Sequence, residues 1–397
     1  MDWLSHGLSN FSAWGIVAYV LITTHITIVT VTVYLHRHAA HRALDLHPAL
    51  QHVFRFCSWI TTGMITREWV AVHRKHHANT ETDDDPHSPR RQGLGTIFWK
   101  GTEAYRAATA DRASIERYGA GCPDDWMERN LYARFPTTGV LTLLAIDIVL
   151  FGFIGLTVWA VQMLWIPVLA AGVVNGVGHF WGYRNYESPD ASTNMLPWGI
   201  VIGGEELHNN HHAYPNSAKL SQKWWEFDIG WMWIRVFQAF GLAKPKSTGP
   251  IVKQVPGKTT LDIDTAWAVL NDRFRLMAKY KNQVVKPLIK LECAKADQAT
   301  GKLFRRARAA LCREQARVSP SGKRRIEAAV DASQALAAAH NLRLRLHDIW
   351  AKRGGNADDL LAALRHWCRD AEATGIQALR DYVDELKSYT LPRLAAA

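Results

Sequence analysis

The chain has 397 residues, of which 48% are hydrophobic and 21% are charged, and its formal net charge is +11. This length allows two domains, and the near-neutral mean hydropathy requires an apolar half to be balanced by a polar half. The five cysteines are scattered and odd in number. They exclude the disulfide framework of a small secreted protein and indicate a reduced, cytosolic environment.

An apolar helix is the first predicted element. Residues 11–35 contain no Asp, Glu, Lys or Arg, and a helix of this length can cross the roughly 30 Å hydrocarbon core of a bilayer. The segment has neither the basic start nor the small-residue cleavage site of a signal peptide. We therefore predict a membrane span that is retained in the protein.

Three histidine clusters follow apolar stretches of the chain. They are His36 with His41, His73 with His76 and His77, and His208 with His211 and His212. In each H-x-x-H-H cluster the outer rings share one helix face, because they are four residues apart, while the middle ring points roughly 100° away. One helix can therefore serve two metal ions. Imidazole suits iron, copper and zinc, whereas the lack of cysteine and methionine in the clusters argues against thiolate and blue-copper sites.

Two later apolar stretches set the predicted topology. Residues 137–181 carry one charge, Asp147, and are long enough for two crossings joined near residues 155–159. Residues 48–66 are less apolar and contain Arg55, so we expect them to lie at the membrane interface. Histidine clusters that meet at one site require an even number of crossings between them, and this condition gives three spans.

The distribution of Lys and Arg predicts which side of the membrane carries the histidines. Residues 1–35 and 156–166 contain neither, whereas residues 36–136 are rich in both, as expected of a cytosolic loop. We expect an all-α integral membrane protein with about three transmembrane helices and an interfacial helix, capped by a cytosolic histidine-rich domain. The N-terminus would lie on the non-cytosolic side.

A polar pair lies near the end of the last predicted span. Asn175 and His179 are four residues apart and therefore share one helix face. Such a pair is costly inside a membrane unless it is functional or paired. A helix-packing contact and a contribution to a metal site both remain open.

The histidine clusters lie in strings that resemble a known family. HRHAAH at residues 36–41, EWVAVHRKHH at 68–77 and EELHNNHH at 205–212 are similar to the three histidine boxes of membrane fatty acyl desaturases of the Δ9, stearoyl-type branch. Further matches are DDPHSPRR at 84–91 and NGVGHFWGYR at 175–184. The resemblance covers roughly residues 11–243 and is specific, because three motifs occur in order. It suggests a bacterial-like form with a C-terminal extension.

The resemblance implies a di-iron site built from nitrogen ligands. One iron ion would be held by His36, His41, His73, His77 and His211. The other would be held by His76, His179, His208 and His212, with Asn175 reaching it through water. Nearby acids would orient the imidazoles by accepting their remaining N–H groups, although each could equally be a surface charge. These acids are Glu68, Asp84, Asp85, Glu205, Glu206 and Asp228.

The implied reaction is the O2-dependent insertion of a cis double bond, at the Δ9 position, into a fatty acyl chain. Breaking two unactivated C–H bonds needs a stronger oxidant than any side chain, so the chemistry would belong to the iron ions and O2. The two electrons required would come from outside, because the chain has no C-x-x-C run and no dinucleotide motif. We expect a ferredoxin-, flavodoxin- or cytochrome-like donor.

The head group of the substrate is left open between a membrane phospholipid and acyl-CoA. Animal acyl-CoA desaturases have a basic residue two positions before the first histidine of the second box, whereas this chain has Ala71. Candidate substrate contacts are aromatic and basic residues in or near the motifs, although aromatic residues also belong to membrane-interface belts. They are Trp69, Arg90, Arg91, Trp181, Tyr183, Arg184 and Trp224.

The composition changes after the last histidine box. We predict a membrane-embedded domain over residues 1–247, a linker over 248–261 and a basic helical extension over 262–397. Residues 273–325 hold sixteen Lys and Arg against three Asp and Glu. This excess of positive charge could belong to a solvated helix face, or it could bind an anionic membrane leaflet, an acidic electron donor or nucleic acid. Attachment to a membrane enzyme favours a leaflet or a donor, so we do not expect a nucleic-acid partner.

Two other functions stay open: a related membrane di-iron hydroxylase, and a non-catalytic histidine-rich metal transporter. A transporter is expected to carry its ligands within its spans along an aqueous path, whereas these clusters lie at the ends of spans. The desaturase interpretation predicts an inner-membrane protein of a bacterium, with the active site on the cytoplasmic face.

Overall fold

The computed structural model describes residues 6–250, 252–351 and 356–392, and the chain divides into two compact units. The first unit contains the residues up to 184 together with 190–249, and the second contains 185–189 and the residues from 250 onward. Both units are helical, and within the described residues six short strands form three separate pairs.

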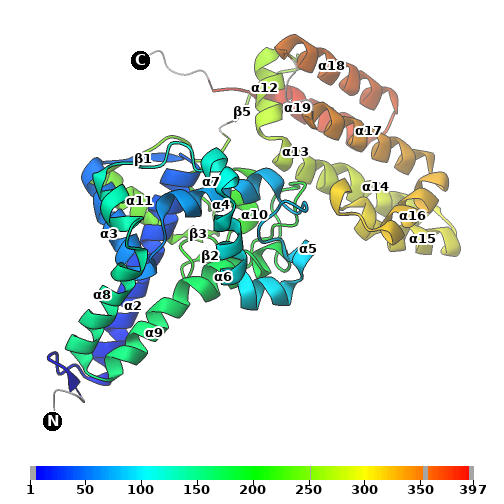
Figure 1. Cartoon of the computed structure of the whole chain (residues 1–397). Helices are drawn as coiled ribbons and strands as arrows, with labels where there is room; N and C mark the ends of the chain where they lie inside the picture. Colours follow the sequence, from blue (N-terminus) through cyan, green and yellow to red (C-terminus); the bar gives the residue numbers. More distant parts are fainter. Residues whose placement is uncertain (1–5, 251, 352–355, 393–397) are drawn as a thin grey trace. The chain divides into compact units, whose positions relative to one another are not determined.

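Three apolar helices lie side by side in the first unit (Figure 1). Helix α2 (Ala13–Val29) continues into the π-helix η1 (Thr30–Ala40), and α9 (Ile154–Ile166) continues into the π-helix η3 (Pro167–Val174). Both continuous helices are long and apolar enough to cross a membrane, and α8 (Pro136–Phe151) is a shorter apolar helix.

The turn between α8 and α9 lies at Gly152 and Phe153, before the predicted position near residues 155–159. Gly152 has φ +63°, a conformation that glycine adopts without steric cost. Gly155 lies inside α9, where the chain passes so close to the backbone of Asp147 that a Cβ atom would lie 2.1 Å from its carbonyl oxygen. The close approach of the two helices therefore decides where the turn lies.

The interfacial segment predicted at 48–66 contains helix α3 (Pro48–Thr62), which packs against η1 and α8. Pro48 starts the helix at a position where its missing N–H is not needed, and Gly63 ends it with φ +63°. The remaining helices of this unit include those that carry most of the clustered histidines. They are α4 (Thr66–Asn79), α5 (Pro89–Gln92), α6 (Leu94–Ala110), α7 (Arg112–Tyr118), η2 (Glu128–Tyr132), η4 (Val177–His179), α10 (His208–Ala213) and α11 (Ile229–Ala239).

Two strand pairs join distant parts of the first unit. Strand β1 (Leu44–Leu46) pairs antiparallel with β4 (Ala243–Pro245), and β2 (Trp198–Gly199) pairs parallel with β3 (Phe227–Asp228). Beside β3, the buried guanidinium of Arg37 donates to both carboxylate oxygens of Asp228 at 2.9 and 2.8 Å. This ion pair fixes the first histidine box to the loop that follows the third.

The second unit is a bundle of helices around one hydrophobic core. The fully buried rings of Tyr280, Trp367 and Tyr382 meet at its centre, with Tyr280 and Tyr382 5.0 Å apart. Strand β5 (Lys253–Gln254) pairs with β6 (Tyr389–Thr390). The helices are α12 (Ile263–Asn271), α13 (Arg273–Tyr280), η5 (Lys281–Val285), α14 (Lys286–Lys295), α15 (Gln298–Leu311), η6 (Gln315–Arg317), α16 (Pro320–Asp331), α17 (Gln334–Ala351), α18 (Ala357–Ala373) and α19 (Gln377–Ser388).

Candidate metal centre

The two H-x-x-H-H clusters lie on helices α4 and α10, as their spacing predicts. On α4 the outer rings of His73 and His77 turn to one side, and the middle ring of His76 turns to the other. On α10 the outer rings of His208 and His212 join His76, while the middle ring of His211 joins His73 and His77. Each helix therefore contributes to both of two histidine sets.

The first histidine box depends on a π-helix. His36 and His41 are five residues apart, and in η1 the His41 N–H donates to the His36 carbonyl at 3.0 Å. This wider turn brings residues five apart onto neighbouring positions, whereas an α-helix would separate them by roughly 140°. The rings of His36 and His41 consequently lie 4.8 Å apart, centre to centre.

Nine imidazoles form two compact sets, which we call the five-histidine set and the four-histidine set. The first is His36, His41, His73, His77 and His211, and the second is His76, His179, His208 and His212. Within each set one ring nitrogen of every residue lies within 4.8 Å of the others. These are the sets that the resemblance implies, and their occupation by metal ions stays a prediction.

The donor chemistry of both sets fits a metal ion that prefers nitrogen ligands. The Nε2 atoms of His76 and His212 are buried and have no hydrogen-bond partner among the described residues. Burial lowers the pKa of His212 to about 4 and holds the pKa values of His73, His77 and His211 well below their usual range. These four rings are therefore neutral at physiological pH, which is the form that binds metal.

Carboxylates contact the Nδ1 atoms of imidazoles in both sets. The Nδ1 of His76 lies 2.8 Å from Asp85, and Glu205 lies 2.8 Å from the Nδ1 of His36 and 3.9 Å from that of His208. Burial alone would raise the pKa of Asp85, but His76 lowers it to about 2. Glu205 contacts one imidazole of each set and so couples their orientations.

Two further carboxylates hold imidazoles and were not predicted. Asp190 lies 3.6 Å from the Nδ1 of His212, and Glu81 lies 3.5 Å from the Nδ1 of His179. Asp190 lies between boxes, where no local pattern singles it out. Glu81 lies two residues before the acidic run that contains Asp85, and its backbone has a positive φ of 64°.

Four predicted acids have other roles. Glu206 accepts hydrogen bonds from the backbone N–H groups of residues 201, 202 and 204, so it orders a loop rather than an imidazole. Asp228 forms an ion pair with Arg37, because a buried guanidinium requires a carboxylate partner. Asp84 is exposed, and Glu68 lies 3.7 Å from Arg112 at the edge of a cavity.

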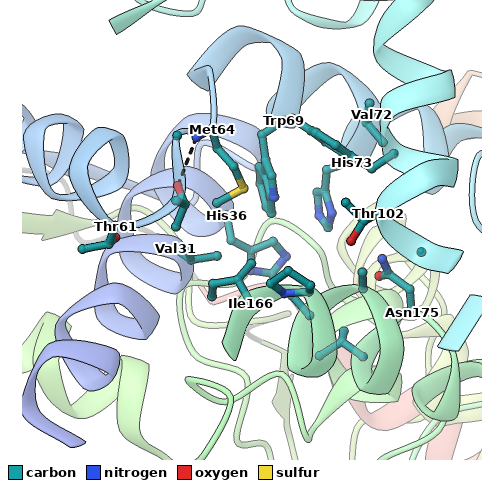
Figure 2. Close-up of a pocket in the computed structure, with 18 of the residues that line it drawn as sticks. Val31, His36, Thr61, Met64, Trp69, Val72, His73, Thr102, Ile166 and Asn175 are labelled. Atoms are coloured by element: carbon teal, nitrogen blue, oxygen red, sulfur yellow. Dashed lines mark hydrogen bonds between the residues drawn. The ribbon is translucent and has the colours of Figure 1, made fainter. Parts of the chain in front are cut away.

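A cavity of about 570 Å³ opens beside the five-histidine set, within the usual size range of small-molecule sites. Figure 2 shows Trp69 and His73 together above His36, with Met64 and Thr61 on one side and Thr102 and Asn175 on the other. The indole of Trp69 stacks on the His73 ring at 4.9 Å. Much of the remaining lining is aliphatic, including Val31 and Ile166, so the cavity suits an apolar ligand.

Of the seven candidate substrate contacts, Trp69 alone lines this cavity as the structure describes it. Trp181 and Trp224 are exposed, and the Tyr183 hydroxyl donates to Glu226 at 2.8 Å. Arg90 lies over the Phe180 ring, Arg91 pairs with the exposed Asp83, and Arg184 donates to backbone carbonyls of 190 and 192. These six residues do not line the cavity as the structure describes it, and their contact with the substrate stays a prediction.

His87 was overlooked although it lies in the DDPHSPRR string. Its buried ring stacks on His76 at 4.3 Å and lines the cavity, and its backbone N–H donates to Asp85 at 3.2 Å. His76, Asp85 and His87 also form a third compact group of potential ligand atoms. The histidine adds an imidazole at the point where the four-histidine set meets the cavity.

Comparison with known proteins agrees with this architecture. A family model described as fatty acid desaturase matches residues 12–246, which is more than half of the chain, and a model described as transposase matches residues 265–395. Delta-9 acyl-lipid desaturase 2 of Arabidopsis thaliana is 30% identical, over 54% of this chain and 68% of its own length. The sn-1 stearoyl-lipid 9-desaturase of Anabaena variabilis is also 30% identical, over 59% of this chain and 85% of its own length. The chain therefore belongs to the fatty acid desaturase family and is an oxidoreductase.

Proposed function

We propose that the protein inserts a cis double bond at the Δ9 position of a fatty acyl chain, using O2 and two iron ions. The observation that carries this proposal is the apolar cavity that ends at a compact set of five imidazoles. A saturated chain, O2, two electrons and two protons would give the alkene and two water molecules. The family match favours this function over a metal transporter.

The five-histidine and four-histidine sets would each hold one iron ion, with Asn175 reaching the second through water. Bound iron supplies the oxidising power for breaking two unactivated C–H bonds with O2. The chain's own residues position the reactants. The aliphatic lining excludes water, Trp69 and His73 form the wall next to the reacting carbons, and Asp85 and Glu205 fix the orientation of the imidazoles.

The substrate would be the acyl chain of a membrane lipid, with acyl-CoA as the alternative. The printed names of the relatives describe acyl-lipid and stearoyl-lipid desaturases. Ala71 stands where animal acyl-CoA desaturases have a basic residue, and this favours a head group other than CoA. Purified protein with a reducing system, supplied in parallel with stearoyl-CoA and with distearoyl phospholipid in nanodiscs, separates the two substrates.

The reaction itself is tested by the lipid profile of bacteria that express the chain. Gas chromatography with mass spectrometry should show new monounsaturated chains with the double bond at carbon 9. Hydroxylated chains would instead identify a hydroxylase, and an unchanged profile in cells that hold the iron-loaded protein would contradict the proposal.

The proposed membrane orientation gives a separate prediction. Three crossings by α2, α8 and α9 would leave the N-terminus outside the cytosol and the histidine sets and C-terminus inside it. Reporter fusions at residue 5 and after residue 397 should give opposite signals with a periplasmic phosphatase and a cytosolic fluorescent protein. Equal signals at both ends would show that the number of crossings is even.

Glu205 gives a test of how the two sets are coupled. Glu205→Gln should weaken iron binding at both sets and lower turnover by about 10- to 100-fold, because one carboxylate contacts an imidazole of each set. Iron retained after dialysis against a graded chelator measures this effect apart from activity. Asp84→Asn is the control, since Asp84 is an exposed acid of a neighbouring motif. Equal iron retention in both variants would remove Glu205 from the site.

A further inference from the structure

The charge of the second unit is concentrated in one half of it. Residues 286–331, which contain α14, α15 and α16, hold twelve Lys and Arg against five Asp and Glu. Residues 332–392 hold eight of each and are neutral in sum. A general need for solubility would not separate the charge in this way. The uneven distribution points to a surface with a specific role.

The three helices of the basic half pack against one another in succession (Figure 1). On α15 the residues Gly301, Phe304 and Ala307 are buried at helical spacing, so the cations between them are exposed. Similar spacing on α16 buries Ile326 and Ala329. We define the basic surface by six exposed cations, Lys290, Lys302, Arg305, Arg306, Lys323 and Arg324.

None of these six cations forms an ion pair with another described residue. Elsewhere in the unit some cations are paired, such as Lys279 with Glu385, Lys387 with Glu372 and Arg345 with Asp370. Clustered cations repel one another, and pairing each with an acid would relieve this repulsion. Their unpaired state therefore suits an acidic partner that supplies the missing charges.

We infer that the basic surface docks an acidic, soluble electron-carrier protein, such as a ferredoxin or flavodoxin. The inference rests on the proposed function, in which each double bond consumes two electrons that an external donor delivers. Complementary charge raises the rate at which such a donor associates and selects it over other proteins. Formation of one double bond then oxidises two molecules of a one-electron donor, and their two electrons, two protons, O2 and the two hydrogen atoms removed from the acyl chain give two water molecules.

The exposed residues favour a soluble protein over a lipid bilayer. A helix that binds at the membrane interface carries large apolar residues opposite its cations. On α15 and α16 the exposed residues include no large hydrophobic side chain, and α14 exposes Leu291 alone among the described residues. The likeness of residues 265–395 to a transposase model makes nucleic acid the main competitor, but attachment to an oxidoreductase favours an electron carrier.

The test compares two charge-reversal variants of the full chain in nanodiscs of zwitterionic lipid. The first replaces Lys302, Arg305 and Arg306 by Glu. The control replaces Arg369 and Arg380, two exposed cations of the neutral half, by Glu. An acidic plant-type [2Fe–2S] ferredoxin is the protein donor, and reduced methyl viologen is a small donor that needs no docking surface.

The first variant should need about tenfold more ferredoxin for half-maximal turnover, and the control should match the wild type. Raising the salt from about 50 to about 300 mM should weaken the wild type but not the first variant. Turnover with methyl viologen and iron content should be the same in all three proteins. An unchanged ferredoxin requirement in the first variant would overturn the inference.

Binding measurements separate this inference from the proposed function. Fluorescence anisotropy of labelled ferredoxin reports docking even if no acyl chain is desaturated, so an inactive enzyme that still binds ferredoxin through the basic surface would refute only the function. If all three proteins bind ferredoxin equally, the inference is wrong. If the first variant also loses binding to a DNA duplex or to phosphatidylserine vesicles, the basic surface binds that partner instead.

Discussion

His76→Ala and His212→Ala are each expected to abolish the double bond in the product and to leave the chain with one iron ion in place of two. Both rings belong to the four-histidine set, and both turn a buried, unpaired Nε2 towards it. Removing a carboxylate behind a ligand typically costs about 10- to 100-fold, so loss of a ligand should exceed the upper figure. Iron per chain and lipid unsaturation measure the two effects.

His38→Ala is the matched control for these variants. His38 lies in the first histidine box between His36 and His41, but its Nδ1 bonds to the Leu44 carbonyl at 2.9 Å and the ring belongs to neither set. This variant should keep both iron ions and most of the activity. Full activity in His76→Ala or His212→Ala would contradict the assignment of the four-histidine set.

Asp228→Ala is expected to destabilise the first unit by about 3–5 kcal/mol, the usual cost of leaving a buried charge without its partner. The side chain of Asp228 receives two hydrogen bonds from Arg37, which is 1% exposed. It also accepts the backbone N–H groups of Leu220 at 2.7 Å and Trp231 at 3.0 Å, the second of which caps α11. Thermal unfolding in detergent, followed together with iron release, measures the loss.

An exposed ion pair provides the comparison for this prediction. Asp45 pairs with Lys246 at 2.7 Å, and both side chains are about half exposed. Asp45→Ala should therefore change the free energy of unfolding by no more than about 1 kcal/mol. If the two variants unfold alike, the Arg37–Asp228 pair does not hold the first box to the loop around β3.

Local spacing predicted the elements of the site because it depends on helix geometry alone. The four-residue interval of the outer histidines required their rings to share a face on α4 and on α10. Absence of charge over residues 11–35 was enough to predict the long apolar helix that contains α2. Trp69 was a sound candidate for the cavity because it lies one helical turn from His73 and so shares its face.

Features that depend on contacts between distant segments could not be found in this way. Asp190 and Glu81 lie next to imidazoles of α10 and η4 only because the chain is folded. Arg37 likewise pairs with Asp228, which is distant from it in the sequence. The five-residue interval of His36 and His41 brings their rings together only because η1 is a π-helix within the packed bundle. Intervals along one helix are set by its own backbone, whereas the partner of a loop carboxylate is set by how the whole chain packs.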